Sequence, residues 1–464
     1  MAKIYTTKDY IEAGCPAHLV IPKGFNIIEE FAFYNRTSLQ SVAIPEGVTK
    51  IEWSAFNGCT SLQDVSIPES VTEIGREAFR GCNLDDADIE TSHFRLKRGL
   101  LISKDNGKLI TSAFIRIKEI SIPWGVTEIE DCAFEGCKSL KSVYIPGSVT
   151  EIGYGVFEGC TSLWGVNIPE SVTKIHLNTF FNCSSLHGIN IPDGIEEIGY
   201  KAFVGCNLDN AYIETPHFRL KQGLLISKDN GELITAAFSR LTDISIPEGV
   251  TEIGDCAFEG CTSLKSINIP EGVTKIGYNA FEGCTSLKSI NIPEGVTKIG
   301  DSAFEGCTFL KGVNIPEGVT KIGYNAFKGC NLDSVDIETS HFKLKRGLLI
   351  SKDNGKLITS AFSRLKNLSI PDNVTIIEGW TFSYLISLKS VNIPKKVSEI
   401  RYSAFSGCTS LKEVTIENPD ISIDDEAFKG CTAITKVNLP EGVTWDKIKE
   451  KFKDSPWGQN KPVE

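Results

Sequence analysis

The sequence predicts a β-solenoid, an elongated coil of short strands in which each turn packs on the next. Three observations predict it. An Ile-Pro pair recurs every 23 residues, a phenylalanine recurs once in each repeat, and a cysteine stands three residues after most of these phenylalanines. A fixed period of roughly 20–50 residues is typical of solenoids, because one repeat cannot bury its apolar face alone. The 464 residues are therefore expected to form one repeat array rather than several globular domains.

The Ile-Pro pairs fall into groups. Within a group the step is 23 residues, and between groups it is 55. The isoleucines are Ile21, Ile44, Ile67, Ile122, Ile145, Ile168, Ile191, Ile246, Ile269, Ile292, Ile315, Ile370 and Ile393. Ile416 fills the next position without its proline, and Leu439-Pro440 closes the array. The longer steps indicate insertions into an otherwise regular coil.

Residues 257–279 show one repeat, AFEGCTSLKSINIPEGVTKIGYN. Its central part alternates apolar and polar residues up to Ile269, which predicts a half-buried strand. Pro270 has no backbone N–H and ends that strand. The following turn leads to a second short β-type segment at 273–276, where Val273 and Ile276 point inward. Each repeat therefore contributes two short strands.

The phenylalanine and cysteine positions predict buried columns along the coil. A free cysteine behaves as a small apolar residue, so one cysteine per repeat in a fixed position indicates a buried ladder. Cys15, Cys132 and Cys256 lie outside the ladder and are the candidates for exposed thiols. The chain has no cysteine or histidine spacing of a zinc site, and we expect neither a metal nor a cofactor.

Three insertions, near 90–115, 214–239 and 338–363, interrupt the repeats. Each begins with a modified strand, 84–89, 208–213 or 332–337, counted here as a further turn of the coil. A β-hairpin is expected to follow, because Asn-Gly between two apolar runs is a strong hairpin signal. His93, His217 and His341 recur 124 residues apart. A hydrogen-bonding role at the hairpin base suits them better than metal binding, which needs converging ligands.

The two ends are expected to act as caps, which a solenoid needs to cover its terminal core faces. Residues 1–20 form the N-terminal cap, with a helical turn expected within 7–14. The solenoid spans 21–440. Residues 441–464 form a C-terminal helical cap, in which Trp445, Ile448 and Phe452 share one face of a helix that starts near Thr444 and stops by Pro456.

Composition excludes several classes of function. The formal charge of −11 and the pI near 5.3 argue against nucleic acid as a partner, because phosphate binding needs a concentrated basic surface. No apolar run approaches the ~18 residues of a membrane span. Catalytic motifs such as GxSxG, HExxH or a phosphate-binding glycine loop are missing outside the repeat itself, and we therefore expect no enzyme.

A candidate protein-binding patch lies on the outward columns of the first strands. These columns carry asparagine, serine, glycine and lysine in most repeats, and Tyr144, Trp164 and His187 break that pattern on consecutive turns. Exposed aromatic residues are enriched at interaction hot spots. Asn167 and Asn190 flank them and complete the candidate site. The alternative is a solvated surface amplified by the repeat, with its aromatic residues explained by packing or drift.

The repeat unit AFEGCTSLKSINIPEGVTKIG resembles that of BspA-like, Treponema-type leucine-rich repeat proteins, and the insert GLLISKDNGKLIT resembles one found inside their arrays. The resemblance covers roughly residues 15–440. It implies a leucine-rich repeat solenoid, a curved right-handed coil with a concave parallel sheet, an irregular convex side and hairpin insertions. It also implies a secreted or cell-surface protein that binds host matrix or other cell-surface proteins in adhesion.

Two functions from different classes stay open. The first is a non-enzymatic protein-binding or adhesion scaffold, monomeric, that presents a concave polar surface. The second is a self-assembling structural spacer without a specific ligand, which the near-identical units 257–279 and 280–302 favour. The N-terminal residues lack the apolar core of a signal peptide, so the sequence is expected to be either cytoplasmic or trimmed of a leader.

Overall fold

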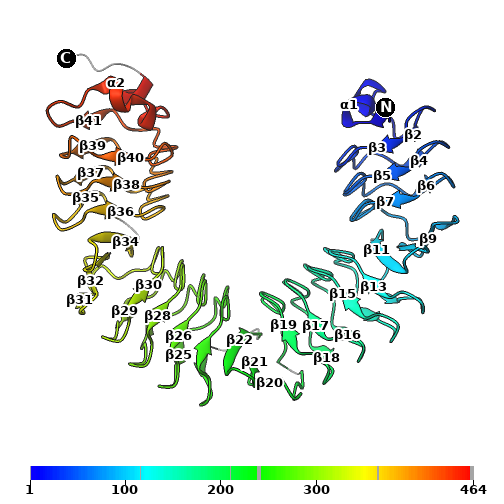
Figure 1. Cartoon of the computed structure of the whole chain (residues 1–464), viewed down its shortest axis with the longest axis horizontal. Coiled ribbons are helices and arrows are strands. Elements are labelled where there is room, and N and C mark those ends of the chain that lie inside the picture. Colours follow the sequence, from blue (N-terminus) through cyan, green and yellow to red (C-terminus); the bar gives the residue numbers. More distant parts are fainter. Residues whose placement is uncertain (1, 115, 210, 238–241, 363–364, 460–464) are drawn as a thin grey trace. The chain divides into compact units, whose positions relative to one another are not determined.

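The computed structural model describes residues 2–114, 116–209, 211–237, 242–362 and 365–459 (Figure 1). Contacts divide the chain into two compact units, and each is described by itself. The first unit comprises 1–229 with 235–239, and the second comprises 230–234 with 240–464. Some residues of the predicted regions lie outside the described ones: residue 1 of the N-terminal cap, 115, 238–239 and 363 at the hairpin ends, and 460–464 of the C-terminal cap.

Each repeat contributes a first strand that ends near its Ile-Pro pair. In the first unit these strands are β2 (His18–Val20), β4 (Ser41–Ala43), β6 (Asp64–Ser66), β12 (Glu119–Ser121), β14 (Ser142–Tyr144), β16 (Gly165–Asn167) and β18 (Gly188–Asn190). In the second they are β23 (Asp243–Ser245), β25 (Ser266–Asn268), β27 (Ser289–Ile290), β29 (Gly312–Val313), β35 (Asn367–Ser369), β37 (Ser390–Ile393), β39 (Glu413–Ile416) and β41 (Lys436–Asn438). Their central residue faces the core, as in β25, where Ile267 is buried between exposed Ser266 and Asn268.

A second strand follows the turn after each Ile-Pro pair. In the first unit these strands are β3 (Ile27–Ile28), β5 (Lys50–Ile51), β7 (Glu73–Ile74), β13 (Glu128–Ile129), β15 (Glu151–Ile152), β17 (Lys174–Ile175) and β19 (Glu197–Ile198). In the second they are β24 (Glu252–Ile253), β26 (Lys275–Ile276), β28 (Lys298–Ile299), β30 (Lys321–Ile322), β36 (Ile376–Ile377), β38 (Glu399–Ile400) and β40 (Ser422–Ile423). Their isoleucines point inward, opposite the first strands.

Equivalent strands of successive repeats pair in parallel, with residues 23 apart facing each other. Strand β14 pairs with β16 through Ser142↔Gly165 and Tyr144↔Asn167, and β26 pairs with β28 through Lys275↔Lys298. The predicted solenoid of stacked parallel strands is therefore confirmed. Its period sets the register, because a slip by one residue would turn every buried side chain outward.

Phenylalanine and cysteine columns fill the space between the ladder of first strands and the ladder of second strands. Phe258, Phe281 and Phe304 stack face to face, with ring centroids 4.9 and 5.1 Å apart. The Cys284 thiol donates a hydrogen bond to the carbonyl of Phe258 at 3.1 Å, so the thiol also satisfies a buried backbone acceptor. Eleven of the twelve ladder cysteines are buried, and Cys261 is half-buried.

The prediction of three exposed thiols was wrong for Cys256. Cys15 is exposed and Cys132 is half-buried, but Cys256 is fully buried. Its backbone adopts a positive φ of 57°, and its N–H donates to the carbonyl of Tyr278 in the next repeat at 2.8 Å. The loop therefore packs on the following turn of the coil instead of facing solvent.

Glycine is required where successive turns meet most closely. A Cβ on Gly277 would lie 2.5 Å from the side-chain oxygen of Asp255 and 2.7 Å from its backbone nitrogen. That same Asp255 oxygen accepts a hydrogen bond from the N–H of Tyr278 at 2.8 Å. The Gly-Tyr sequence thus lets an aspartate of one repeat hold the backbone of the next.

Antiparallel strands occupy the insertion sites. The first insertion holds β8 (Asp88–Glu90), β9 (Phe94–Lys97), β10 (Leu100–Ser103) and β11 (Lys108–Ser112), and the third holds β31 (Ile337–Glu338), β32 (Phe342–Lys345), β33 (Leu348–Ser351) and β34 (Lys356–Ser360). In the second, β20 (Phe218–Lys221) pairs with β21 (Leu224–Ser227) in the first unit, and the division between the units falls within β22 (Glu232–Ala236). The last insertion strand joins the second-strand ladder: β11 pairs in parallel with β13, and β34 with β36.

The sequence predicts that the modified strands 84–89, 208–213 and 332–337 form further turns of the parallel stack. This prediction was wrong. Strand β8 pairs antiparallel with β9, and β31 pairs antiparallel with β32. In the second insertion none of the described residues of 208–213 lies in a strand, and an isolated antiparallel bridge joins the following Glu214 to Arg219. Pairing with a hairpin that is close in sequence costs less chain entropy than pairing with the preceding turn of the coil. The first-strand ladder therefore stops at the insertions within each unit.

The insertion histidines form hydrogen bonds at the hairpin base, as predicted. The Nδ1 atoms of His93 and His217 lie 2.9 Å from carboxylate oxygens of Asp105 and Asp229, and His341 lies 3.1 Å from Asp353. Each pair joins the residue before the first hairpin strand to the turn after the second. The histidines therefore close the hairpin.

Both ends carry the expected helices. Helix α1 (Thr7–Glu12) is preceded by β1 (Ile4–Tyr5), which adds to the second-strand ladder, and Tyr5 stacks on Phe33 with centroids 5.7 Å apart. At the other end, α2 (Trp445–Ile448) starts directly after Thr444 and runs into a 3₁₀ turn, η1 (Lys449–Phe452). A further helix, α3 (Pro456–Gln459), begins where the sequence predicted a stop, because proline is favourable in the first turn of a helix.

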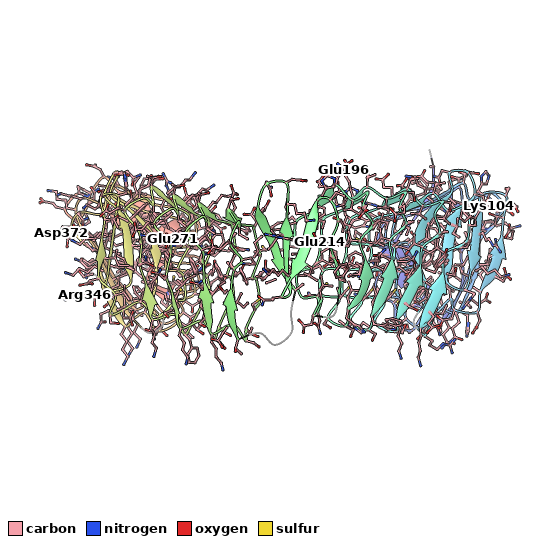
Figure 2. All side chains as sticks on the ribbon, turned by 90° about the horizontal axis from the view of Figure 1, so that it is seen from below. Lys104, Glu196, Glu214, Glu271, Arg346 and Asp372 are labelled. Carbon is pink, nitrogen blue, oxygen red and sulfur yellow. The ribbon has the colours of Figure 1, made fainter. Side chains whose placement is uncertain are left out.

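Charged and polar side chains project from the outside of each unit (Figure 2). None of the described helices has both the length and the hydropathy of a membrane span.

Candidate functional site

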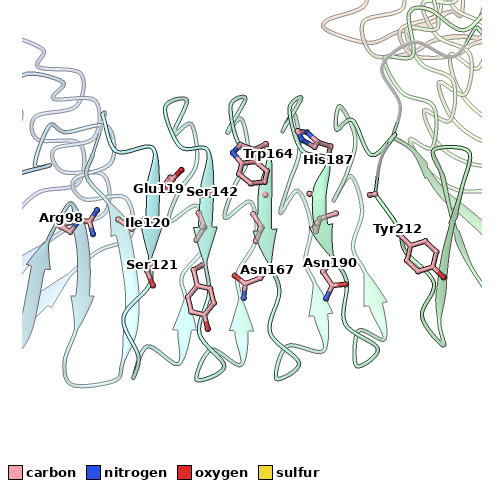
Figure 3. A pocket seen from close by; sticks show the side chains of 17 residues that line it. Arg98, Glu119, Ile120, Ser121, Ser142, Trp164, Asn167, His187, Asn190 and Tyr212 are labelled. Atoms are coloured by element: carbon pink, nitrogen blue, oxygen red, sulfur yellow. The ribbon is translucent and has the colours of Figure 1, made fainter.

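A shallow groove of about 930 Å³ lies on the outer face of the first-strand ladder in the first unit (Figure 3). Its floor is the four-stranded parallel sheet β12-β14-β16-β18. The five residues of the predicted patch line this one groove: Tyr144, Trp164, Asn167, His187 and Asn190. The structure therefore brings together on one surface residues that the sequence had only placed on successive repeats.

The groove has a trench of small residues between two rows of larger ones. Ser142, Gly165 and Gly188 are paired across β14, β16 and β18 and form its floor. Trp164 and His187 lie on one side of this row, and Asn167 and Asn190 lie on the other (Figure 3). Tyr144 belongs to the asparagine side, because it pairs with Asn167. Because a strand rises ~3.3 Å per residue, the two rows are ~10 Å apart, about the width of one extended chain.

Trp164 lies against the glycine of the neighbouring strand. A Cβ on Gly188 would be 3.4 and 3.5 Å from the Cε3 and Cζ3 atoms of the indole, and 3.0 Å from the Trp164 carbonyl oxygen. The imidazole of His187 stacks beside the indole, with ring centroids 6.0 Å apart and an angle of 26° between the planes. The indole thus packs over the Gly188 position, where a Cβ would touch the ring at an ordinary distance and would crowd only the Trp164 carbonyl oxygen.

The polar groups of the groove differ in what they already bind. Asn167 bridges to β14: its Oδ1 accepts from the Ile145 N–H and its Nδ2 donates to the Ile145 carbonyl, both at 2.9 Å. His187 places Nδ1 2.7 Å from the Ser185 carbonyl, so Nδ1 carries the proton and Nε2 is left as an acceptor. Within the described part of the chain, the Asn190 amide has no hydrogen-bond partner. Asn190 and His187 are therefore available to a ligand, whereas Asn167 is structural.

Two insertions supply the ends of the groove, and sequence reasoning missed both contributions. Arg98 comes from the turn between β9 and β10, and Ala211 with Tyr212 comes from the start of the second insertion. Tyr212 is 82% exposed, more than any other large apolar residue among those that the structure describes. The available signal was the 124-residue spacing of the insertions, which places one on each side of the four-stranded sheet.

The arrangement suits binding better than catalysis. Its acidic, basic and imidazole side chains are Glu119, Arg98 and His187, and the His187 Nδ1 is occupied by a backbone carbonyl rather than by a nucleophile. Tyr144 and Trp164 are 58% and 45% exposed, a large area for residues of this kind. Such aromatic side chains, with polar groups around them, are the usual composition of an interaction hot spot.

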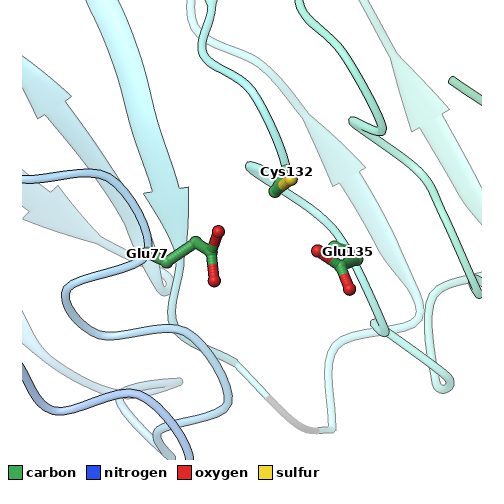
Figure 4. Close-up of side chains that lie close together, drawn as sticks. All are labelled: Glu77, Cys132 and Glu135. Carbon is green, nitrogen blue, oxygen red and sulfur yellow. The ribbon is translucent and has the colours of Figure 1, made fainter. Parts of the chain in front are cut away.

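A second cluster, of Glu77, Cys132 and Glu135, brings its possible ligand atoms within 4.8 Å of one another (Figure 4). The guanidinium of Arg80 already pairs with both carboxylates, with contacts of 3.0 Å to Glu77 and 2.6 Å to Glu135. Burial, followed by the charge of Glu135, raises the pKa of the Cys132 thiol to about 12. A metal would need the thiolate and would compete with the arginine. The cluster is therefore best understood as an ion-pair network.

The family model for the BspA type leucine rich repeat region, in six copies, matches residues 8–103, 112–225, 236–352 and 359–453. A leucine-rich repeat protein from Bacteroides ovatus is 30% identical, covering 68% of this chain and 76% of that protein, with a TM-score of 0.37. A leucine rich cell surface protein from Faecalibacterium prausnitzii is 25% identical, covering 92% and 87%, with a TM-score of 0.39. No curated protein matches the chain.

The matched residues extend over most of the chain and include every repeat of both units. They coincide with the paired parallel strands and with the phenylalanine and cysteine columns described above. Leucine-rich repeat solenoids are generally scaffolds for protein interaction and not enzymes. The chain belongs to the BspA-type leucine-rich repeat family.

Proposed function

We propose that this protein is a non-enzymatic binding scaffold that captures a protein ligand in the groove over β12, β14, β16 and β18. The observation that carries the proposal is the meeting of exposed Tyr144, Trp164 and Tyr212 with available polar groups in one groove. In most other repeats the same positions hold small, polar or charged residues, such as Ser266 and Asn268 on β25, and none holds tyrosine or tryptophan. The aromatic residues are thus confined to one block of the array.

The ligand class follows from the family and from the chemistry of the groove. A host matrix protein or another cell-surface protein fits an adhesion role, with the scaffold secreted or held at a cell surface. The acidic charge of the whole chain disfavours nucleic acid. A monomer is expected to suffice, because the groove is complete within one unit of one chain.

The test is saturable binding of the whole chain to a panel of purified extracellular-matrix and bacterial surface proteins. Trp164→Ala and Tyr144→Ala should each weaken the binding of a true ligand about tenfold or more, the loss typical of a hot-spot residue. Trp124→Ala is the matched control, because Trp124 is 79% exposed and does not line the groove. Equal binding by all variants would reject the groove as the site.

The alternative is a self-assembling spacer. The near-identical repeats 257–279 and 280–302 favour it, because identical surfaces repeated along a chain can pair with those of a second copy. Light scattering over a wide concentration range separates the two functions. Oligomers that grow with concentration would support the spacer, and a constant monomer mass would leave the binding scaffold.

A further inference from the structure

Building on the proposed function, we infer that the groove takes a proline-rich segment of its protein ligand in the polyproline II conformation. The segment lies across β14, β16 and β18, along the trench of Ser142, Gly165 and Gly188. Aromatic-lined grooves are a recurring way to bind such segments, which are stiff before they bind.

The two central strands beneath the groove, β14 and β16, cannot accept an added strand. Strand β14 is hydrogen-bonded to β12 on one side and to β16 on the other, and β16 is likewise held between β14 and β18. A ligand that crosses these strands therefore gains side-chain contacts without a main-chain ladder. A flexible peptide would lose much of that gain in ordering its backbone. A polyproline II segment is already ordered before it binds, so it loses the least conformational entropy on binding.

The spacing of the sheet matches the pitch of this conformation. Tyr144 and Asn190 occupy the same row two strands apart, since Tyr144 pairs with Asn167 and Asn167 with Asn190. Neighbouring strands are ~4.8 Å apart, so these residues are separated by ~9–10 Å. Polyproline II has three residues per turn and rises ~3.1 Å per residue, which gives a turn of ~9 Å. Residues i and i+3 of the ligand can therefore meet equivalent positions along the row.

The hydrogen-bonding groups fit a chain rich in carbonyls and poor in N–H. Proline keeps its carbonyl acceptor and lacks the N–H donor. Trp164 Nε1, the Asn190 amide and the Tyr144 hydroxyl have no hydrogen-bond partner among the described residues, and each can donate. The indole and phenol rings supply flat apolar surfaces on both sides of the trench, against which pyrrolidine rings can pack.

The distribution of charged residues around the groove also favours a proline-rich ligand. The charged residues that line the groove, Arg98 and Glu119, both lie at its β12 end, whereas the part over β14, β16 and β18 carries none apart from the titratable His187 (Figure 3). The middle of the ligand is therefore uncharged, as a run of prolines is. Charged residues of the ligand belong at the β12 end, where Arg98 can pair with an acidic side chain.

The experiment uses the whole chain and an array of synthetic peptides with a central proline run and varied flanking residues. The same peptides with alanine in place of proline, and a set of neutral oligosaccharides, complete the probes. We expect saturable binding of a subset of proline peptides, with affinity lowered about tenfold or more in the alanine versions and by Trp164→Ala.

A second variant acts on the trench without touching the aromatic residues. A Cβ on Gly165 would meet only the Gly188 carbonyl oxygen, at an ordinary 3.5 Å, so the backbone has room for a side chain there and Gly165→Val should fill the trench. It should abolish peptide binding. Gly312→Val is the matched control, because Gly312 holds the same position on β29 in the second unit. Urea unfolding verifies that both variants are folded.

Three outcomes would overturn the inference. One is the absence of any proline peptide whose binding depends on Trp164 and Gly165. Another is binding of the oligosaccharides in the trench in place of peptides. The third is a protein ligand whose binding needs Trp164 but is not competed by proline peptides; in that case the proposed function stands and only the ligand conformation is wrong. A protein ligand indifferent to Trp164 would reject the groove itself.

Discussion

The guanidinium of Arg80 lies 2.6 Å from the carboxylate of Glu135, a residue 55 positions later in the sequence. This ion pair spans the first insertion and joins the repeat before it to the repeat after it. Arg76 and Asp131 form a second pair across the same insertion, but in a more exposed position. Side chains thus connect turns of the coil where the parallel ladder is interrupted.

Arg80→Ala should lower the free energy of unfolding of the first unit by about 1–3 kcal/mol, because it leaves Glu77 and Glu135 partly buried without their counter-ion. Arg76→Ala should cost at most about 1 kcal/mol, since its side chain is 53% exposed and the pair is screened by solvent. Urea titration of both variants checks the difference. If both variants lost the same free energy of unfolding, the greater burial of the Arg80 ion pair would not contribute to stability.

Gly188→Ala should shift the backbone of Trp164, and the indole with it, because the new methyl group crowds the Trp164 carbonyl oxygen. The new methyl group would lie 3.0 Å from the Trp164 carbonyl oxygen and 3.4 Å from the ring. We expect a changed chemical shift of the Trp164 indole N–H and a several-fold loss of groove binding, with stability altered by less than about 1 kcal/mol. Gly165→Ala, whose methyl makes only an ordinary contact, should leave the indole resonance in place. An unshifted resonance in Gly188→Ala would contradict the described packing.

The cysteine ladder should make the protein sensitive to alkali. Burial raises the pKa of the Cys59 thiol to about 12, whereas the unfolded chain ionises near its ordinary value of about 8.5. As the pH rises between these values, the unfolded state loses its proton first, and folding is progressively disfavoured by about 1.4 kcal/mol per pH unit for each such thiol.

Comparison of the wild type with Cys59→Ala isolates this contribution. Urea unfolding between pH 8 and 10.5, under reducing conditions, should show a stability that falls less steeply in the variant. The variant should also be less stable at neutral pH, because it loses the hydrogen bond from Cys59 to the Phe33 carbonyl at 3.0 Å. Parallel pH profiles would mean that the folded and unfolded thiols ionise alike.

Phe452→Ala should open the C-terminal end of the core. The Phe452 ring stacks on Phe428 with centroids 4.5 Å apart and is covered by Trp457. Removing it should cost about 3–4 kcal/mol in the stability of this end and promote self-association of the uncovered core. Calorimetry and light scattering measure the two effects. Phe309→Ala, at a 60% exposed position, is the control and should change neither stability nor self-association. A Phe452→Ala protein that stays monomeric and as stable as the wild type would contradict the capping role.

The repeat fold could be predicted because each of its elements is determined by residues close in sequence, and these residues recur in every repeat. Pro270 ends a strand, Phe281 and Cys284 fill a column, and the period sets the register without knowledge of distant contacts. The insertions were harder. The segment at 84–89 has the apolar pattern of a turn of the coil, yet β8 pairs with β9, because a partner only a few residues away forms its contacts with less loss of chain entropy.

The candidate site was predictable only in part. Tyr144, Trp164 and His187 stood out because they depart from the repeat, and the period placed them side by side. Arg98 and Tyr212 could not be found in this way, since they reach the groove from insertions whose direction the period does not specify. The sequence also could not separate Asn167 from Asn190. The structure does, because the Asn167 amide is hydrogen-bonded to the Ile145 backbone and the Asn190 amide is not.

The antiparallel insertions also determine how such a chain can change in length. A parallel ladder transmits its register from turn to turn, so a gain or loss inside it disturbs all that follows. Strands β8 and β31 end that transmission, because they pair with their own hairpins and not with the turn before. A block of 124 residues, from Phe94 to Phe218 or from Phe218 to Phe342, can therefore be duplicated or deleted by recombination while the repeats on either side keep their pairing.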